Sequence, residues 1–371
     1  MNLSLSLPLI GESVSADPDG EELAEKYKKS LEAGENLLLA PTEGITHKRL
    51  DEISRDDEFS RLCREAMKKT EKAAGKYAAV CGLIAPSGIE EYNSGIFESL
   101  YFDYLEKITV LKDAGAKLIL LKNAGSLGEM RAAVFASETA DIPICIIMDV
   151  DEDGKKQNGT DYIASLITLQ ALGAAAFGIS CIDGIYTLTE LLGKAFPHAE
   201  IPLIASGNFS KLNEKEISGL IESGASVFLN SGDVMDKETI SLIKHSGSKF
   251  EISTEKDSNA AAIDREAFFL FDDLVLSEPI DCSYGLAEDI IDLDDETVNS
   301  VCIELFTADD AALLADNASM TKLPVTVRTN DPVTLEAALR YFQGRLIIDT
   351  SCEIDYDILK QLAEKYGAIL Y

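Results

Sequence analysis

The chain has 371 residues, of which 46% are apolar, so it can bury a large core and is long enough for one large domain and a smaller one. Its 33 basic and 65 acidic residues give a formal net charge of −32, and this negative field repels nucleic-acid phosphates and anionic membrane surfaces. We therefore expect no nucleic-acid partner and no membrane partner.

The N-terminus and the cysteines predict a cytoplasmic protein. The opening MNLSLSLPLIGESVS has an apolar stretch, but neither a basic region before it nor a small-residue cleavage site. The longest apolar runs, such as IPICIIM, are far shorter than the ~20 residues that span a bilayer. Seven cysteines scattered without close pairs do not form a disulfide pattern, which favours a reducing compartment.

Short apolar runs alternate with amphipathic stretches through the first two thirds of the chain. The predicted strands are residues 3–10, 36–42, 77–84, 117–122, 143–150, 175–181, 201–206 and 226–231. The predicted helices are residues 20–34, 48–75, 97–115, 126–140, 161–173, 185–196, 214–224 and 237–247. Nearly continuous apolar strands indicate burial on both faces, and the recurring glycine before a strand is typical of a helix C-terminus. The pattern predicts an α/β fold, a (β/α)8 TIM barrel over residues 1–247. The alternative is an open doubly wound sheet, but no Gly-rich phosphate loop follows the first strand.

A smaller unit follows the predicted barrel. Residues 248–264 are polar and predict a linker, and residues 265–371 return to βα repetition. Its predicted strands are FFLF (268–271), VCIELF (301–306), PVTVRT (324–329), RLIIDT (345–350) and AILY (368–371). These are too few to close a barrel, so we expect a small open α/β domain.

The function of a TIM barrel lies at the carboxyl ends of its strands. The polar residues predicted there include Thr42, Glu43, Lys122, Asn123, Asp149, Cys181, Asn208, Ser231 and Asp233. The three histidines, His47, His198 and His245, fall in predicted helices or loops, which disfavours a Ser-His-Asp triad or a His-based metal site. The run DVDEDG looks like the start of a calcium loop, but Thr160 stands where such a loop needs a bidentate glutamate. It predicts a solvated turn.

Several blocks resemble the homocysteine S-methyltransferases, a family that includes the N-terminal barrel of cobalamin-dependent methionine synthase. AGAKLILLKNAGSLGEMRAAVFA resembles the family's Ala-Gly-Ala-Asp…Leu-Ile-Glu-Thr segment and its Glu-x-Arg-Ala-Ala helix. MDVDEDGKKQNGTD is similar to its Asp-x-x-Gly turn and Gly-Thr-Asp, and ALGAAAFGISC to its Leu-Gly-Ala-Asp…Gly-Val-Asn-Cys. The order and spacing of the blocks agree over roughly residues 20–246. The stretch LPVTVRTNDPVTLEAALRYFQGRLIIDT resembles part of a pterin-binding barrel, the module that follows in methionine synthase.

The resemblance implies a zinc site that this sequence does not complete. In the family, three cysteine thiolates hold zinc, which keeps homocysteine as a thiolate, and Cys181 matches the first of them. The other two come from a Gly-Gly-Cys-Cys-Gly run, where this chain reads LNSGDVMDKE. The family's glutamate in Leu-Ile-Glu-Thr is Lys122 here, and the Asn before the cysteine is Ser180. A lone thiolate, with Asp233 and a water, is a poor zinc site because zinc normally takes three or four protein ligands.

Alternatives stay open for the two reactive side chains. Cys181 is a remnant zinc ligand, a reactive thiol without metal, or a small buried core residue. Lys122 either pairs with a carboxylate such as Glu43 or Asp149, or forms a Schiff base if it is desolvated. Asn208 is a candidate substrate contact, and an Asx turn would use the same residue.

Three functional hypotheses follow. The first is a homocysteine S-methyltransferase or methionine synthase-like barrel for thiol-directed methyl transfer, with Cys181 and Lys122 as catalytic residues and impaired use of zinc. Glu43, Asn208, Ser231 and Asp233 would then contact a small-molecule thiol or amino acid. The second is a non-catalytic binding or partner module that acts with corrinoid or pterin methyltransferase subunits. The third is a lyase or aldolase chemistry through Lys122.

Overall fold

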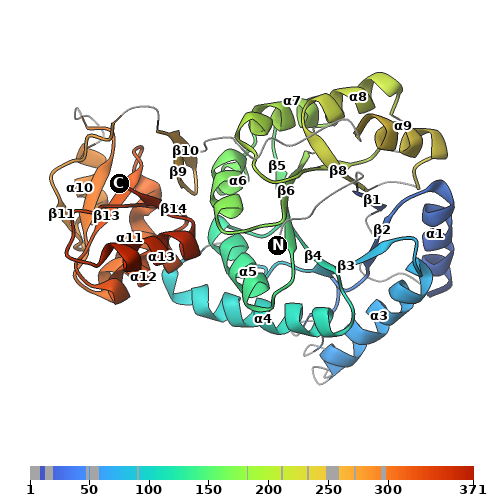
Figure 1. Cartoon of the computed structure of the whole chain (residues 1–371), viewed down its shortest axis with the longest axis horizontal. Helices are drawn as coiled ribbons and strands as arrows, with labels where there is room; N and C mark the ends of the chain where they lie inside the picture. Colours follow the sequence, from blue (N-terminus) through green and yellow to red (C-terminus); the bar gives the residue numbers. More distant parts are fainter. Residues whose placement is uncertain are drawn as a thin grey trace.

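The structure is a computed structural model that describes residues 9–12, 20–46, 50, 58–89, 92–181, 183–209, 212–231, 234–247, 259–270, 273–293 and 298–371. Eight parallel strands form a closed barrel in sequence order (Figure 1). They are β1 (Leu9–Glu12), β2 (Leu37–Ala40), β3 (Ala79–Ile84), β4 (Leu118–Lys122), β5 (Ile144–Val150), β6 (Ala176–Cys181), β7 (Leu203–Gly207) and β8 (Ala225–Asn230). β1 pairs with both β2 and β8, which closes the ring. The predicted TIM barrel is confirmed.

Helices follow the strands and surround the barrel (Figure 1). They are α1 (Gly20–Ala33), α3 (Phe59–Ala74), α4 (Phe97–Asp113), α5 (Leu127–Thr139), α6 (Tyr162–Ala171), α7 (Ile185–Ala195), α8 (Glu214–Glu222) and α9 (Lys237–Gly247), with short 3-10 helices η2 (Ser94–Ile96) and η3 (Phe196–His198). Their bounds agree with the prediction except at α3, which begins at Phe59, while most of the earlier part of the predicted helix 48–75 lies outside the described residues. Gly115 and Gly173 have φ of 105° and 92°, the left-handed conformation expected just past a helix.

The C-terminal unit has two sheets. A five-stranded parallel sheet has the order β11 (Ile280–Asp281), β12 (Val301–Glu304), β13 (Val325–Arg328), β15 (Ile347–Ile348), β16 (Ile369–Leu370). Its helices are α10 (Leu286–Leu293), α11 (Ala308–Asn317), α12 (Pro332–Tyr341) and α13 (Tyr356–Tyr366), with the 3-10 helix η4 (Ala318–Met320). This is the small open α/β unit predicted from the sequence.

A second, three-stranded sheet was not expected. It has the order β10 (Glu266–Phe269), β9 (Ala260–Ile263), β14 (Gly344–Arg345) and is antiparallel. β9 lies within the stretch predicted as a linker, yet its four residues are buried, because Ala260 and Ala262 pack on Ala164 and Ile167 of α6. Strand β10, predicted as part of a βα repeat, is instead half of a tight hairpin.

Two arginines, the buried Arg131 and the half-buried Arg340, join the C-terminal unit to the barrel. Arg131 of α5 is 1% exposed and donates to the carbonyls of Leu339 (2.6 Å), Arg340 (3.0 Å) and Phe342 at the end of α12. A helix leaves the carbonyls at its C-terminus without intrahelical donors, and the helix dipole also stabilises a cation at this end. Arg340 returns a two-bond ion pair to Glu98 of α4, at 2.6 and 3.0 Å.

Candidate functional site

Register and pleat determine which side chains point into the barrel. The interior is lined by alternate strand residues, among them Leu118 and Leu120 of β4, Cys145 of β5 and Ala176 of β6. Successive strand residues point to opposite faces, so the same inward rows continue to Lys122, Asp149 and Ser180 at the carboxyl ends. Asp149 and Ser180 are register partners across β5 and β6.

A charged cluster forms the mouth of the barrel, defined here as Glu43, Lys122, Asp149 and Lys156. Burial raises the pKa of Glu43 above its ordinary value, an effect that Lys122 opposes and Asp149 reinforces. Burial lowers the pKa of Lys156, against the opposing influence of Asp149 and Glu129. Glu43 therefore lies near both Lys122 and Asp149, and Lys156 lies near Asp149, so partly buried charges of both signs come together at this end of the barrel.

The loops around Lys122 are tied to buried groups. Asn123 has a φ of 61°, a left-handed conformation that asparagine tolerates, so the chain turns immediately after Lys122. Glu129 of α5 is 1% exposed and accepts hydrogen bonds from the Ser87 amide (2.5 Å), the Tyr104 hydroxyl (2.6 Å) and the Gly125 amide. One carboxylate thus joins the loops after β3 and β4, which fixes the side of the mouth where Lys122 lies.

Cys181 lies on the opposite face of its strand from this cluster. It pairs in register with Val150, which is 3% exposed, whereas its neighbour Ser180 pairs with the inward Asp149. The Cys181 thiol lies 3.8 Å from the Asp151 carbonyl oxygen and 3.8 Å from Asp183 Oδ2. Burial raises its pKa, and the nearby carboxylates add to the effect. This thiol has the opposite electrostatic environment from an activated cysteine, whose pKa is lowered by cations.

The residues present do not fit the family's three-thiolate zinc centre. Cys63, Cys81 and Cys145 are buried in the barrel core, while Cys282, Cys302 and Cys352 belong to the C-terminal unit. Within the described residues, no three His, Cys, Asp or Glu side chains are grouped to hold a metal ion. Asp233, the other residue considered as a ligand, lies outside them.

The remaining predicted contacts occupy the ends of β7 and β8. Asn208 and Ser231 are exposed, and the Ser231 amide donates to the Gly207 carbonyl at 2.9 Å. Sequence reasoning missed Asn230, which is fully buried and accepts from the Phe209 amide at 2.9 Å. A polar side chain at the end of an apolar strand was the available signal for it.

The acidic run after β5 forms a turn, as predicted. Asp151 Oδ1 accepts from the amides of Asp153 (3.0 Å) and Lys155 (2.8 Å), so the carboxylate is used by its own backbone. The same turn carries Lys156, which sequence reasoning also missed. Two consecutive lysines in a polar loop are normally both exposed to solvent, so no pattern in the sequence indicates that Lys156 is partly buried. His198 lies in η3 and His245 in α9, so neither follows the carboxyl end of a strand directly, while His47 is outside the described residues.

The closed barrel with polar groups at the carboxyl ends of its strands defines a TIM-barrel protein whose chemistry is set by its strand-end loops. The chain belongs to the homocysteine S-methyltransferase family, which its residues 5–236 match. Methionine synthase of Mycobacterium leprae is 28% identical over 111 residues, which cover 28% of this chain and 9% of that protein. The methionine synthase of Mycobacterium tuberculosis is 29% identical over a stretch of the same length. The match thus spans about a tenth of these relatives.

Solved structures of the homocysteine methyltransferase MmuM from Escherichia coli have the same fold. The metallated form aligns with a TM-score of 0.55 at 16% identity and covers 65% of this chain and 96% of that chain. The apo form aligns with a TM-score of 0.52 at 17% identity. No helix in the described parts of the chain is long and apolar enough to cross a membrane.

Proposed function

We propose that the barrel mouth binds a small amino acid of the homocysteine type, and that zinc-dependent methyl transfer is impaired. The family acts on homocysteine, and this chain keeps the family's barrel. The observation that carries the proposal is the cluster of opposite charges at the mouth, with the only strand-end thiol of the described barrel on the other strand face.

The charges of the mouth complement those of an amino acid. At neutral pH such a ligand carries an ammonium and a carboxylate on one carbon atom. Glu43 and Asp149 would accept hydrogen bonds from the ammonium, and Lys122 and Lys156 would donate to the carboxylate. Partial desolvation strengthens each of these contacts compared with the same contacts in water.

The impairment follows from the ligand set. A catalytic zinc normally takes three protein ligands, and Cys181 with a raised pKa is mostly protonated at neutral pH. Without the metal, the mouth would still orient the ligand's ammonium and carboxylate, but no group of three metal-ligating side chains among the described residues is placed to hold its sulfur as a thiolate.

Isothermal titration with L-homocysteine and L-methionine tests the proposal. We expect both to bind, with affinities within about threefold because the shared ammonium and carboxylate are recognised. Lys122→Met should weaken binding at least about tenfold. Lys117→Met is the matched control, because Lys117 is exposed at the opposite end of the same strand. Equal binding by the parent and Lys122→Met would refute the assignment.

The second candidate function is a partner module for corrinoid or pterin methyltransferase subunits. The absence of a fitting metal group in the described residues, together with the C-terminal unit attached through Arg131, favours it. If neither amino acid binds while the chain co-elutes with a corrinoid-binding subunit, this second function replaces the first. Borohydride trapping with a carbonyl ligand tests the third possibility, imine formation at Lys122.

A further inference from the structure

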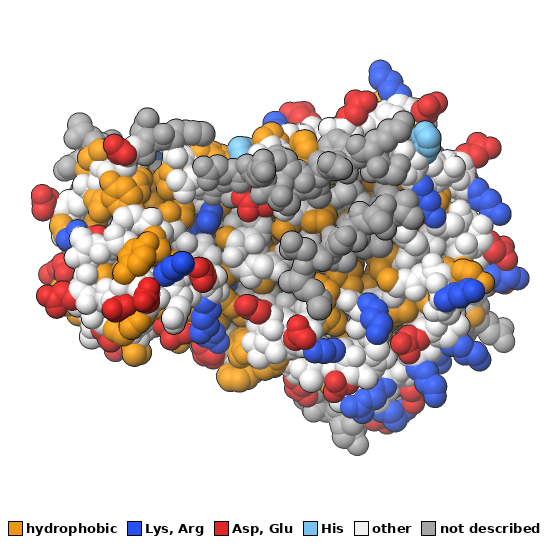
Figure 2. Space-filling model, in the orientation of Figure 1, with side chains coloured by type: hydrophobic (Ala, Val, Ile, Leu, Met, Phe, Trp, Pro, Cys, Tyr) orange, Lys and Arg blue, Asp and Glu red, His pale blue; other side chains and the backbone are white. Residues whose placement is uncertain are grey.

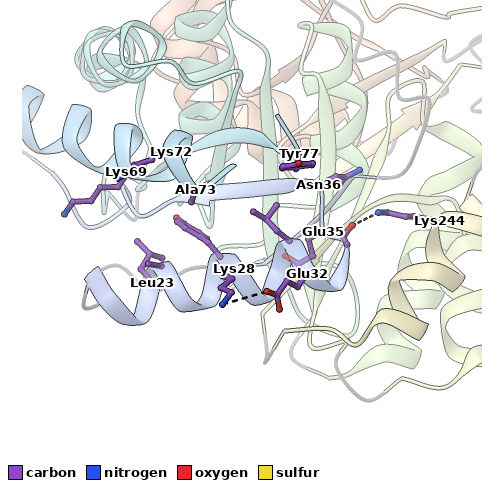
Figure 3. Close-up of a pocket in the computed structure, with 14 residues that line it drawn as sticks. Leu23, Lys28, Glu32, Glu35, Asn36, Lys69, Lys72, Ala73, Tyr77 and Lys244 are labelled. Atoms are coloured by element: carbon purple, nitrogen blue, oxygen red, sulfur yellow. Dashed lines mark hydrogen bonds and ion pairs between the residues drawn. The ribbon is translucent and has the colours of Figure 1, made fainter. Parts of the chain in front are cut away.

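A long groove lies outside the barrel, away from the mouth. It has a volume of about 1050 Å³, and one wall is a continuous stripe of α1 that includes Leu23, Tyr27 and Leu31. The opposite wall includes Lys69 and Lys72 at the end of α3 (Figure 3). The groove extends to residues 34–36, which immediately precede β2, so it lies toward the amino end of the strands.

The Tyr27 side chain in the α1 wall of the groove is held in place. Tyr27 is 3% exposed, and its hydroxyl donates to the Leu39 carbonyl (2.6 Å) and lies 3.2 Å from Thr70 Oγ1. The ring therefore has one orientation and cannot turn to fill the groove. Tyr77 closes one end and is 72% exposed, an unusual exposure for a large aromatic side chain.

The lining of the groove carries four lysines against two glutamates, Glu32 and Glu35, in a protein that is strongly acidic as a whole. Figure 2 shows many Lys and Arg side chains on the right of the barrel, with Asp and Glu side chains among them, where Figure 1 places α1 and α3. Of the four lysines lining the groove, Lys28 pairs with Glu32 at 4.0 Å and Lys244 donates to the Gly34 carbonyl. Lys69 and Lys72 have no ion pair with any described residue. Two ammonium groups at the rim thus remain available to an anion.

We propose that this groove binds an elongated apolar molecule with one anionic end group, such as a medium-chain carboxylate. The apolar body lies along α1 over Leu23, Tyr27 and Leu31, and the anion meets Lys69 and Lys72. The stripe from Leu23 to Gly34 is roughly 16 Å long at the helical rise per residue, which suits an extended chain better than a compact ligand. Charge complementarity selects the occupant, because the rest of this chain repels anions.

Calorimetric titration of the full chain with dodecanoate tests the proposal, with dodecanol and dodecyltrimethylammonium as neutral and cationic probes. We expect one dodecanoate per chain, weaker binding as salt rises, and weak binding of the other two probes. The double variant Lys69→Gln/Lys72→Gln should weaken dodecanoate binding about tenfold or more. Lys68→Gln is the matched control, because Lys68 is on the same helix but does not line the groove.

Three results would overturn the proposal. The first is no saturable binding of dodecanoate, and the second is equal binding by the parent and the double variant. The third is a dimer, detected by light scattering and dissociated by Tyr77→Ser, which would assign the groove to a second copy of the chain. None of these results depends on ligand binding at the barrel mouth, so the two sites are tested separately.

Discussion

We expect the contact between Arg131 and α12 to contribute strongly to the free energy of unfolding. Arg131→Met keeps the approximate length of the side chain but removes a buried cation and its three hydrogen bonds to the carbonyls of Leu339, Arg340 and Phe342. Hydrogen bonds to charged groups contribute about 1.5–3 kcal/mol each, so the gross loss is roughly 5–9 kcal/mol.

Part of that loss is offset. Burial lowers the pKa of Arg131 to about 10, and its Nε is buried without an acceptor in the described structure, so the cation carries a desolvation cost. Because three carbonyls lose their donor while this desolvation cost is relieved, we expect a net loss of about 3–5 kcal/mol.

Urea denaturation followed by circular dichroism measures the free energy of unfolding of each variant. The control Arg64→Met removes an exposed arginine from α3 and should change this free energy by less than about 0.5 kcal/mol. A loss below about 1 kcal/mol for Arg131→Met would show that these contacts do not hold the C-terminal unit on the barrel.

Three further predictions concern Glu43 at the mouth, the Cys181 thiol and the domain interface. Burial raises the pKa of Glu43 in the folded state, so ionisation of this carboxyl group opposes folding. Glu43→Gln should therefore increase the free energy of unfolding at pH 7, and this gain should disappear as the pH falls below about 4, where Glu43 is protonated in both states. Urea denaturation at several pH values measures the gain. Because its pKa is raised, Cys181 should react with iodoacetamide at pH 7.5 several-fold more slowly than the cysteine of a free peptide. Mass spectrometry of the labelled peptides measures the two rates, and equal rates would contradict the prediction. Tyr92→Phe removes the hydrogen bond to the Tyr341 carbonyl (2.9 Å) and should lower the free energy of unfolding by about 1 kcal/mol. An unchanged free energy of unfolding would show that this bond does not stabilise the domain interface.

The order of elements could be predicted from the sequence because its signals are local. Apolar runs of strand length, amphipathic runs of helix length and glycines such as Gly115 set the βα alternation without knowledge of distant contacts. Strand β9 could not be predicted in the same way. Its alanine-rich residues become a buried strand only because α6 offers Ala164 and Ile167 to pack against.

The position of Cys181 could not be predicted because β6 is apolar on both faces. The polar pattern of such a strand does not reveal which alternate residues point inward. Only the register with β5 distinguishes Ser180, opposite Asp149, from Cys181, opposite Val150. The cluster of Glu43, Lys122 and Asp149 was accessible to prediction, because all three follow strands at the same end of the barrel.

The contacts of Arg131 were also beyond sequence reasoning. The Glu-x-Arg-Ala-Ala segment was visible, yet the partners of Arg131 are more than two hundred residues further along the chain. Whether the C-terminal unit shares function with pterin-binding barrels stays a prediction.

We propose that this barrel keeps the family's scaffold without the three-thiolate zinc centre that the resemblance implies. The most direct test is the zinc content of the purified, untagged protein after equilibration with zinc and removal of loose metal, measured by mass spectrometry beside Cys181→Ser. We expect well below one zinc per chain, and the same value for the variant. One zinc per chain that disappears in a folded Cys181→Ser variant would contradict it, since Cys181 would then be a metal ligand.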